Sequence, residues 1–158
     1  MSKNLLSSVD VFRELSPSDL ALLEKSAKEI LFPTDTIIFQ QGDVGDKMYL
    51  IAEGFVEIWK SEAQEIKGSR LARLKQGEIF GEMALFDKES RSASAITSLT
   101  NETKLLVWEE KDLNRLIQSH PEIGVKILVN FLKKISYRLR IANDAIHTLL
   151  RSNQYIGL

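Results

Sequence analysis

Two kinds of hydrophobic pattern divide this chain of 158 residues, and the division constrains its fold more than any single motif. Up to about residue 110, short runs of β-branched and aromatic residues alternate with turn-forming clusters of glycine and aspartate, which is typical of an antiparallel β-roll or jelly-roll barrel. From Lys111, apolar residues recur at helical spacing, and only Gly124 interrupts a helix expected to run from about Pro121 to about Ser152. The sequence therefore predicts an α+β fold, with a β-roll and an N-terminal helix in residues 1–120 and a long C-terminal helix in residues 121–158.

Local signals place the elements within the roll. The first helix is expected to begin at Ser16, because Ser-Pro-Ser-Asp supplies a capping hydroxyl, a proline at the first helical position and an acid in the first turn. The runs MYLIA and FVEIW flank Glu53-Gly54 and predict a β-hairpin, and the polar residues 61–69 predict the tip of another. Further strands are expected at residues 36–40, 70–75, 94–98 and 103–108.

Residues 80–96, with the sequence FGEMALFDKESRSASAI, bring together a glycine, an acid, a base and several small residues. Gly81 lets the backbone approach a ligand closely, and residues 82–85 can form one helical turn whose free N–H groups favour a phosphate. Arg91 can hold two phosphate oxygens at once, with Ser92 and Ala93 adding backbone N–H groups. Because a carboxylate repels phosphate, Glu82 is expected to accept a hydrogen bond from a hydroxyl of the same ligand. A sugar phosphate fits this pairing.

Each of these residues alone has a plainer explanation. Arg91 follows Asp87 and Glu89 and is, taken singly, a solvated loop charge, and Gly81-Glu82 is a turn before a helix. Their combination and spacing favour a ligand site.

The order F-G-E-M-A-L, a short variable loop and then R-S-A-S-A resembles the phosphate-binding cassette of cyclic nucleotide-binding domains, and residues 41–56 (QGDVGDKMYLIAEGFV) are similar to the strand pattern of the same family. The resemblance implies that Glu82 takes the ribose 2′-hydroxyl and Arg91 the cyclic phosphate. It implies cyclic AMP as the ligand, while the hydroxyl of Ser92 leaves cyclic GMP open. The implied ligand-binding residues of the cassette are Phe80, Gly81, Glu82, Met83, Ala84, Arg91, Ser92 and Ala93.

In the same family a C-terminal helix lies over the pocket, touches the base and often dimerises. The resemblance places that contact in residues 138–143, with Arg140 and Asn143 as candidate base ligands. Independently, apolar residues in this helix follow alternating steps of three and four, the seam of a two-helix coiled coil. We expect its near end to pack on the roll and its far end on another copy of the chain. The seam consists of Leu132, Ile135, Leu139, Ala142, Ile146 and Leu149.

Composition excludes several other classes of protein. The formal net charge of −1 gives no global attraction to nucleic acid or to an anionic membrane, and residues 151–158 are too short for a helix-turn-helix, so DNA binding is not expected. The absence of cysteine excludes disulfides and thiol catalysis, and no metal cluster or nucleophile with a base is evident. No apolar run reaches the length of a membrane span, so a cytoplasmic protein without a membrane partner is expected.

Together these observations predict a non-enzymatic sensor domain without cofactor or metal. Its C-terminal helix is expected to cap the nucleotide and to transmit binding to a homodimer or to an unknown protein effector. The alternative is a protein-interaction module in which the pocket is vestigial.

Overall fold

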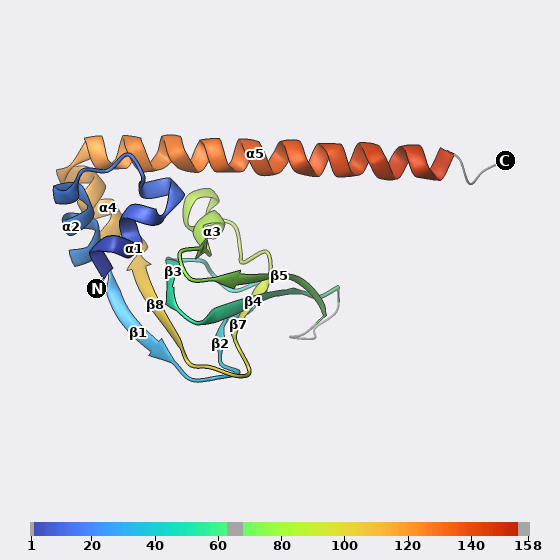
Figure 1. The fold of residues 1–158 in the computed structure, drawn as a ribbon, viewed down its shortest axis with the longest axis horizontal. Coiled ribbons are helices and arrows are strands. Elements are labelled where there is room, and N and C mark those ends of the chain that lie inside the picture. The colour runs from blue at the N-terminus through green and yellow to red at the C-terminus, as the bar shows by residue number, and fades with distance from the viewer. Residues whose placement is uncertain (1, 63–67, 155–158) are drawn as a thin grey trace.

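The computed structural model describes residues 2–62 and 68–154 and contains two antiparallel four-stranded sheets that form a roll (Figure 1). One sheet has the order β1-β8-β3-β6, formed by Lys28–Phe32, Thr103–Glu109, Lys47–Glu53 and Ile79–Phe80. The other has the order β2-β7-β4-β5, formed by Ile37–Phe39, Ser94–Thr97, Phe55–Lys60 and Ser69–Lys75. This is the predicted fold class.

The helices lie outside the roll. Most of them gather at one end, where they pack against the first turns of the long helix α5, while the last turns of α5 project past the strands (Figure 1). A short helix, α3, is inserted between β6 and β7, as the cassette predicts. The helices are α1 (Ser2–Ser8), the 3₁₀ turn η1 (Asp10–Phe12), α2 (Pro17–Lys25), α3 (Glu82–Asp87), α4 (Glu110–Ser119) and α5 (Pro121–Gln154).

The predicted helix start at Ser16 is confirmed. The Ser16 hydroxyl accepts a hydrogen bond from the Asp19 backbone N–H at 3.2 Å, and the Asp19 carboxylate accepts one from the Ser16 N–H at 3.1 Å, a reciprocal capping box. The elements before it, α1 and η1, carry no comparable signal and were not predicted. Burial holds them in place, since Leu6 and Phe12 are fully buried in the helical core.

The predicted hairpin of MYLIA and FVEIW is wrong. These runs form β3 and β4, but β3 pairs with β8 and β6, whereas β4 pairs with β5 and β7 in the other sheet. Gly54 between them has φ +91°, and a Cβ there would lie 2.7 Å from the carbonyl oxygen of Glu102. The glycine thus turns the chain from one sheet into the other, which is the role of a corner in a roll.

The second predicted hairpin does form, because β4 and β5 pair in antiparallel register from Phe55 and Lys75 to Lys60 and Ser69. Most of its predicted tip, residues 63–67, lies outside the described residues. Strand β1 was not predicted.

Trp108, on β8, connects the sheets to the helices. Its side chain is fully buried, its Nε1–H donates to the Leu23 carbonyl at 2.9 Å, and its ring meets Phe12 edge to face at 5.9 Å. A second, smaller core fills the space between the two sheets and includes Tyr49 and Phe80. The pocket described below opens beside this second core.

Two different faces of α5 are apolar. Ile123, Ile127 and Phe131 are buried against the other helices, whereas the predicted seam is exposed along its length, with 64% of Leu132 and 59% of Leu139 accessible. Ile127 and Leu132 point about 140° apart around the helix axis, because each residue turns the helix by about 100°. The near end of α5 packs on the domain, as expected, and it does so through a face other than the seam.

None of the described helices combines the length and the apolarity needed to cross a bilayer.

Candidate functional site

The candidate site begins at Gly81, between β6 and α3. Its φ of +75° belongs to the left-handed region that glycine adopts without strain. A Cβ at this position would lie 2.8 Å from the Nη1 atom of Arg91 and 3.1 Å from the ring of Tyr49. The glycine therefore allows the guanidinium group of Arg91 to lie directly against the backbone of the cassette.

Arg91 is held from several sides, although only 4% of the residue is exposed. Its Nη1 donates to the Gly81 carbonyl at 2.6 Å and its Nη2 to the Lys47 carbonyl at 2.8 Å, while the guanidinium lies 4.2 Å from the centre of the Phe39 ring. Its Nε is buried and has no hydrogen-bond partner among the described residues. Burial lowers the pKa of Arg91 below its ordinary value, partly offset by the nearby Tyr49, Asp46, Asp43 and Glu82.

This arrangement leaves a buried positive charge whose neutral partners do not balance it. Such a charge is costly to bury unless an anion pairs with it. The geometry therefore suits an anionic ligand.

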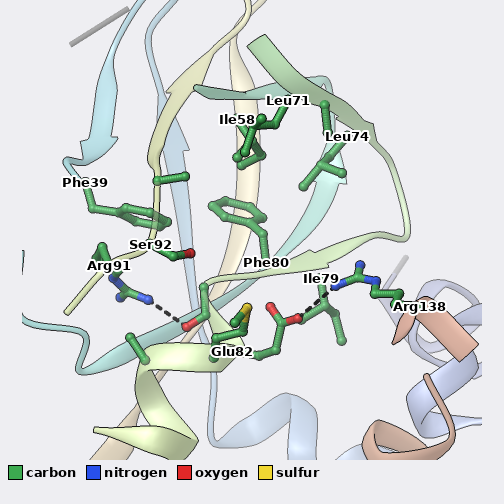
Figure 2. Close-up of a pocket in the computed structure, with 15 residues that line it drawn as sticks. Phe39, Ile58, Leu71, Leu74, Ile79, Phe80, Glu82, Arg91, Ser92 and Arg138 are labelled. Carbon is green, nitrogen blue, oxygen red and sulfur yellow. Dashed lines mark hydrogen bonds and ion pairs between the residues drawn. The ribbon is translucent and has the colours of Figure 1, made fainter. Parts of the chain in front are cut away.

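A cavity of about 440 Å³ lies between Arg91 and α5 (Figure 2). Arg91 and Arg138 approach it from opposite sides, and Glu82 lies between them. Its upper wall in this view is apolar and comes from β4 and β5, with Ile58, Leu71 and Leu74. The full lining is Phe39, Ile58, Leu71, Ala72, Leu74, Ile79, Phe80, Gly81, Glu82, Met83, Ala84, Arg91, Ser92, Ala93 and Arg138.

Glu82 is the carboxylate of this lining, and only 7% of its side chain is exposed. Its Oε1 forms an ion pair with Nη1 of Arg138 at 3.4 Å, which links the cassette to α5. A second link between α3 and α5 is apolar, since the rings of Phe86 and Phe131 meet edge to face at 5.2 Å. The short cassette helix is therefore in direct contact with the long helix.

The structure brings the predicted cassette residues together around this cavity. All eight, from Phe80 to Ala84 and from Arg91 to Ala93, line it. Arg140 and Asn143 do not line it, because both lie farther along α5 with their side chains exposed. That any of these residues contacts a ligand stays a prediction.

Sequence reasoning missed part of the lining. Arg138 falls within the segment where a contact from α5 was expected, but it was not chosen as a site residue. The apolar wall was missed altogether, because Ile58, Leu71 and Leu74 read as ordinary strand residues. Leu71 and Leu74 are three positions apart, so strict alternation would place them on opposite faces of the strand, and the register shift of β5 opposite Ile58 and Trp59 is not visible in the sequence.

Comparison with known proteins agrees with the geometry. A family model described as a cyclic nucleotide-binding domain matches residues 29–120. The cyclic AMP receptor protein of Thermus thermophilus is 35% identical over 135 residues, which are 84% of this chain and 58% of that protein. The chain therefore spans less than two thirds of the length of this relative.

Solved structures show the same fold. The catabolite activator protein of Thermus thermophilus matches with a TM-score of 0.77 and 33% identity, covering 89% of this chain and 62% of that one. The regulatory domain of Toxoplasma gondii PKA, solved with cAMP, matches with a TM-score of 0.70 and 26% identity, covering 87% and 49% of the two chains.

Proposed function

Because the chain belongs to the cyclic nucleotide-binding domain family, we propose that its cavity binds a cyclic nucleotide and that the chain acts as a regulatory sensor domain, not as an enzyme. The observation that carries this proposal is Arg91, a buried guanidinium that lines the cavity, with an unpartnered Nε and no balancing anion in hydrogen-bond contact among the described residues. A cyclic phosphate supplies that anion.

The rest of the cavity is compatible with the other parts of the ligand. Glu82 lines the cavity, and we expect it to accept the ribose 2′-hydroxyl, which is the free hydroxyl that remains after cyclisation through the 3′- and 5′-oxygens. The volume of about 440 Å³ lies within the usual range for small-molecule sites. The apolar wall of Ile58, Leu71 and Leu74 offers a surface for a purine ring.

Cyclic AMP is the expected ligand. The relatives reported above include a cyclic AMP receptor and a kinase regulatory domain solved with cAMP. Ser92 lines the cavity with a hydroxyl that can also contact a guanine amino group, so cyclic GMP is the competing ligand to test.

We expect α5 to report binding. It touches the cassette through Arg138 and Phe131, and its seam is an exposed apolar stripe with coiled-coil spacing. A parallel homodimer on this seam places Arg138 and Asn143 at flanking positions that meet between two helices. Asn143 of the partner subunit would then lie near the pocket, where it could make the predicted contact with the base. Arg140 has no comparable support.

Titration calorimetry with cyclic AMP tests the proposal. Arg91→Ala should weaken binding by about tenfold or more, because losing hydrogen bonds to a charged group costs at least about 1.4 kcal/mol, one decade in affinity. Arg91→Lys keeps the charge but not the planar fork, so its affinity for cyclic AMP should lie between those of the wild type and Arg91→Ala. Arg115→Ala removes an exposed arginine from α4 and should bind as the wild type does.

Equal affinity of the wild type and Arg91→Ala would contradict the phosphate site. No binding of either cyclic AMP or cyclic GMP by the wild type would favour the interaction module with a vestigial pocket. Tighter binding of cyclic GMP by tenfold or more, about 1.4 kcal/mol, would reject the expected base.

A further inference from the structure

Met83 carries an accessible sulfur atom in a chain that has few. The sequence contains no cysteine and three methionines, at positions 1, 48 and 83. Met48 lies in β3 and is fully buried in the core, whereas 52% of Met83 is exposed, and residue 1 lies outside the described residues. Of the two described methionines, Met83 is therefore the one that an oxidant dissolved in water can reach.

The position of Met83 places this sulfur at the candidate ligand site. It lies in the first turn of α3, where Glu82, Ala84 and Leu85 are buried and Met83 is exposed. Met83 also lines the cavity that Arg91 lines (Figure 2). Its side chain is thus open to solvent in the empty cavity and would be covered by a ligand there.

A peroxide converts such a thioether into a sulfoxide. A lone pair of the sulfur attacks one oxygen of hydrogen peroxide, and the S–O bond forms as the O–O bond breaks. The departing hydroxide takes the proton of the transferred oxygen and leaves as water. The sulfur is oxidised, the peroxide is reduced, and a flexible apolar side chain becomes a polar one.

A sulfoxide at this position opposes an anionic ligand in two ways. Its oxygen is a hydrogen-bond acceptor, and covering a polar atom without giving it a partner costs free energy. That oxygen also carries partial negative charge, next to the helical turn whose N–H groups are expected to meet the phosphate, so it repels the ligand. Both effects act in the same direction.

We propose that Met83 is a peroxide-sensitive modification site, and that its oxidation to the sulfoxide weakens binding of the cyclic nucleotide. This inference rests on the proposed function. A bound nucleotide covers the same sulfur and therefore slows its oxidation. Methionine sulfoxide reductases reverse the modification, so the site is a switch and not only a point of damage.

The test treats the full chain with hydrogen peroxide, removes the peroxide and titrates cyclic AMP by calorimetry. Mass spectrometry of peptides locates the added oxygen. Met83 should oxidise before Met48, and more slowly when cyclic AMP is saturating. The oxidised chain should bind about tenfold more weakly, since an unpaired buried polar group costs about a decade in affinity or more. Treatment with methionine sulfoxide reductases A and B, which act on the two sulfoxide epimers, should restore the affinity.

Met83→Leu is the matched variant, because it keeps an apolar side chain of similar size and removes the sulfur. Its affinity before treatment is its own reference, and peroxide should leave that affinity unchanged. Met83→Gln introduces a polar acceptor of similar length and should weaken binding without any peroxide.

Equal affinity of the treated and untreated wild type, with Met83 shown to be oxidised, would overturn the inference and leave nucleotide binding intact. An equal loss of affinity in treated Met83→Leu would do the same, because the sensitive group would then lie elsewhere. Oxidation of Met48 before Met83 would also contradict it. An untreated wild type that binds neither cyclic AMP nor cyclic GMP would reject the proposed function and, with it, this inference.

Discussion

A methyl group added at Gly45 would lie 2.1 Å from the Cβ of Ala84, so the loop before β3 and the cassette helix α3 touch at van der Waals distance. Both residues are buried. The same loop is hydrogen-bonded to the backbone of Arg91, since the Gly42 N–H donates to the Arg91 carbonyl at 2.9 Å and the Arg91 N–H to the Asp43 carbonyl at 2.8 Å. Gly45 therefore helps to set the distance between α3 and Arg91.

Gly45→Ala should destabilise the fold by about 1–3 kcal/mol through overpacking and should also weaken cyclic AMP binding. Thermal unfolding followed by circular dichroism measures the first effect, and calorimetry measures the second. Adding Ala84→Gly removes the clashing methyl group and should restore part of both losses. A Gly45→Ala variant as stable as the wild type would show that α3 can move away freely.

Arg91 and Glu82 can be identified as site residues from the sequence, because they lie nine positions apart in one cassette with a family pattern. The pairing of Glu82 with Arg138 cannot be predicted in this way. These residues are 56 positions apart, and their contact depends on the line that α5 takes across the roll. Side chains that meet only through tertiary packing leave no local signal.

The same distinction holds for whole elements. The start of α2 follows from a capping box within four residues, Ser16 to Asp19, and was predicted to the residue. The strands that pair with β3 and β4 could not be predicted from such a local signal, because each pairs with residues far away in the sequence. Examples are Leu105 on β8, which pairs with β3, and Ile96 on β7, which pairs with β4. Two adjacent strands with a glycine between them fit a hairpin and a corner equally well.

The seam of α5 is a largely exposed apolar stripe. In the described chain, 64% of Leu132, 55% of Ile146 and 64% of Leu149 remain accessible. Contiguous apolar surface of this kind marks an interaction site. The spacing of three and four favours a second copy of the same helix.

Changing Leu139 and Ile146 to Lys should convert a dimer into a monomer, because both side chains would be buried in the seam and charges there are unpaired. The monomer should keep its cassette but bind cyclic AMP more weakly. Sedimentation velocity measures the first outcome and calorimetry the second. Ile141→Lys, at an exposed apolar position outside the seam, is the matched control and should remain dimeric. A wild type that sediments as a monomer at tens of micromolar would contradict the seam.

Over the whole molecule, two paths connect the pocket to the helices. One is polar, from Glu82 to Arg138, and the other is apolar, from Phe86 to Phe131. Phe131 also belongs to the helical core around Trp108, so we expect that any shift of α3 on binding would act on a tightly packed unit. A ligand changes this arrangement only if it binds the docked and undocked states unequally.

Hydrogen exchange of the full chain, with and without saturating cyclic AMP, tests the central claim most directly because it reports on the cassette and on α5 in one measurement. We predict slower exchange in residues 81–93, where we propose that the phosphate binds, and in residues 131–142, the part of α5 that contacts the cassette through Phe131 and Arg138. Arg91→Ala at the same ligand concentration should show little of either effect. Unchanged exchange in residues 81–93 of the wild type would contradict the account.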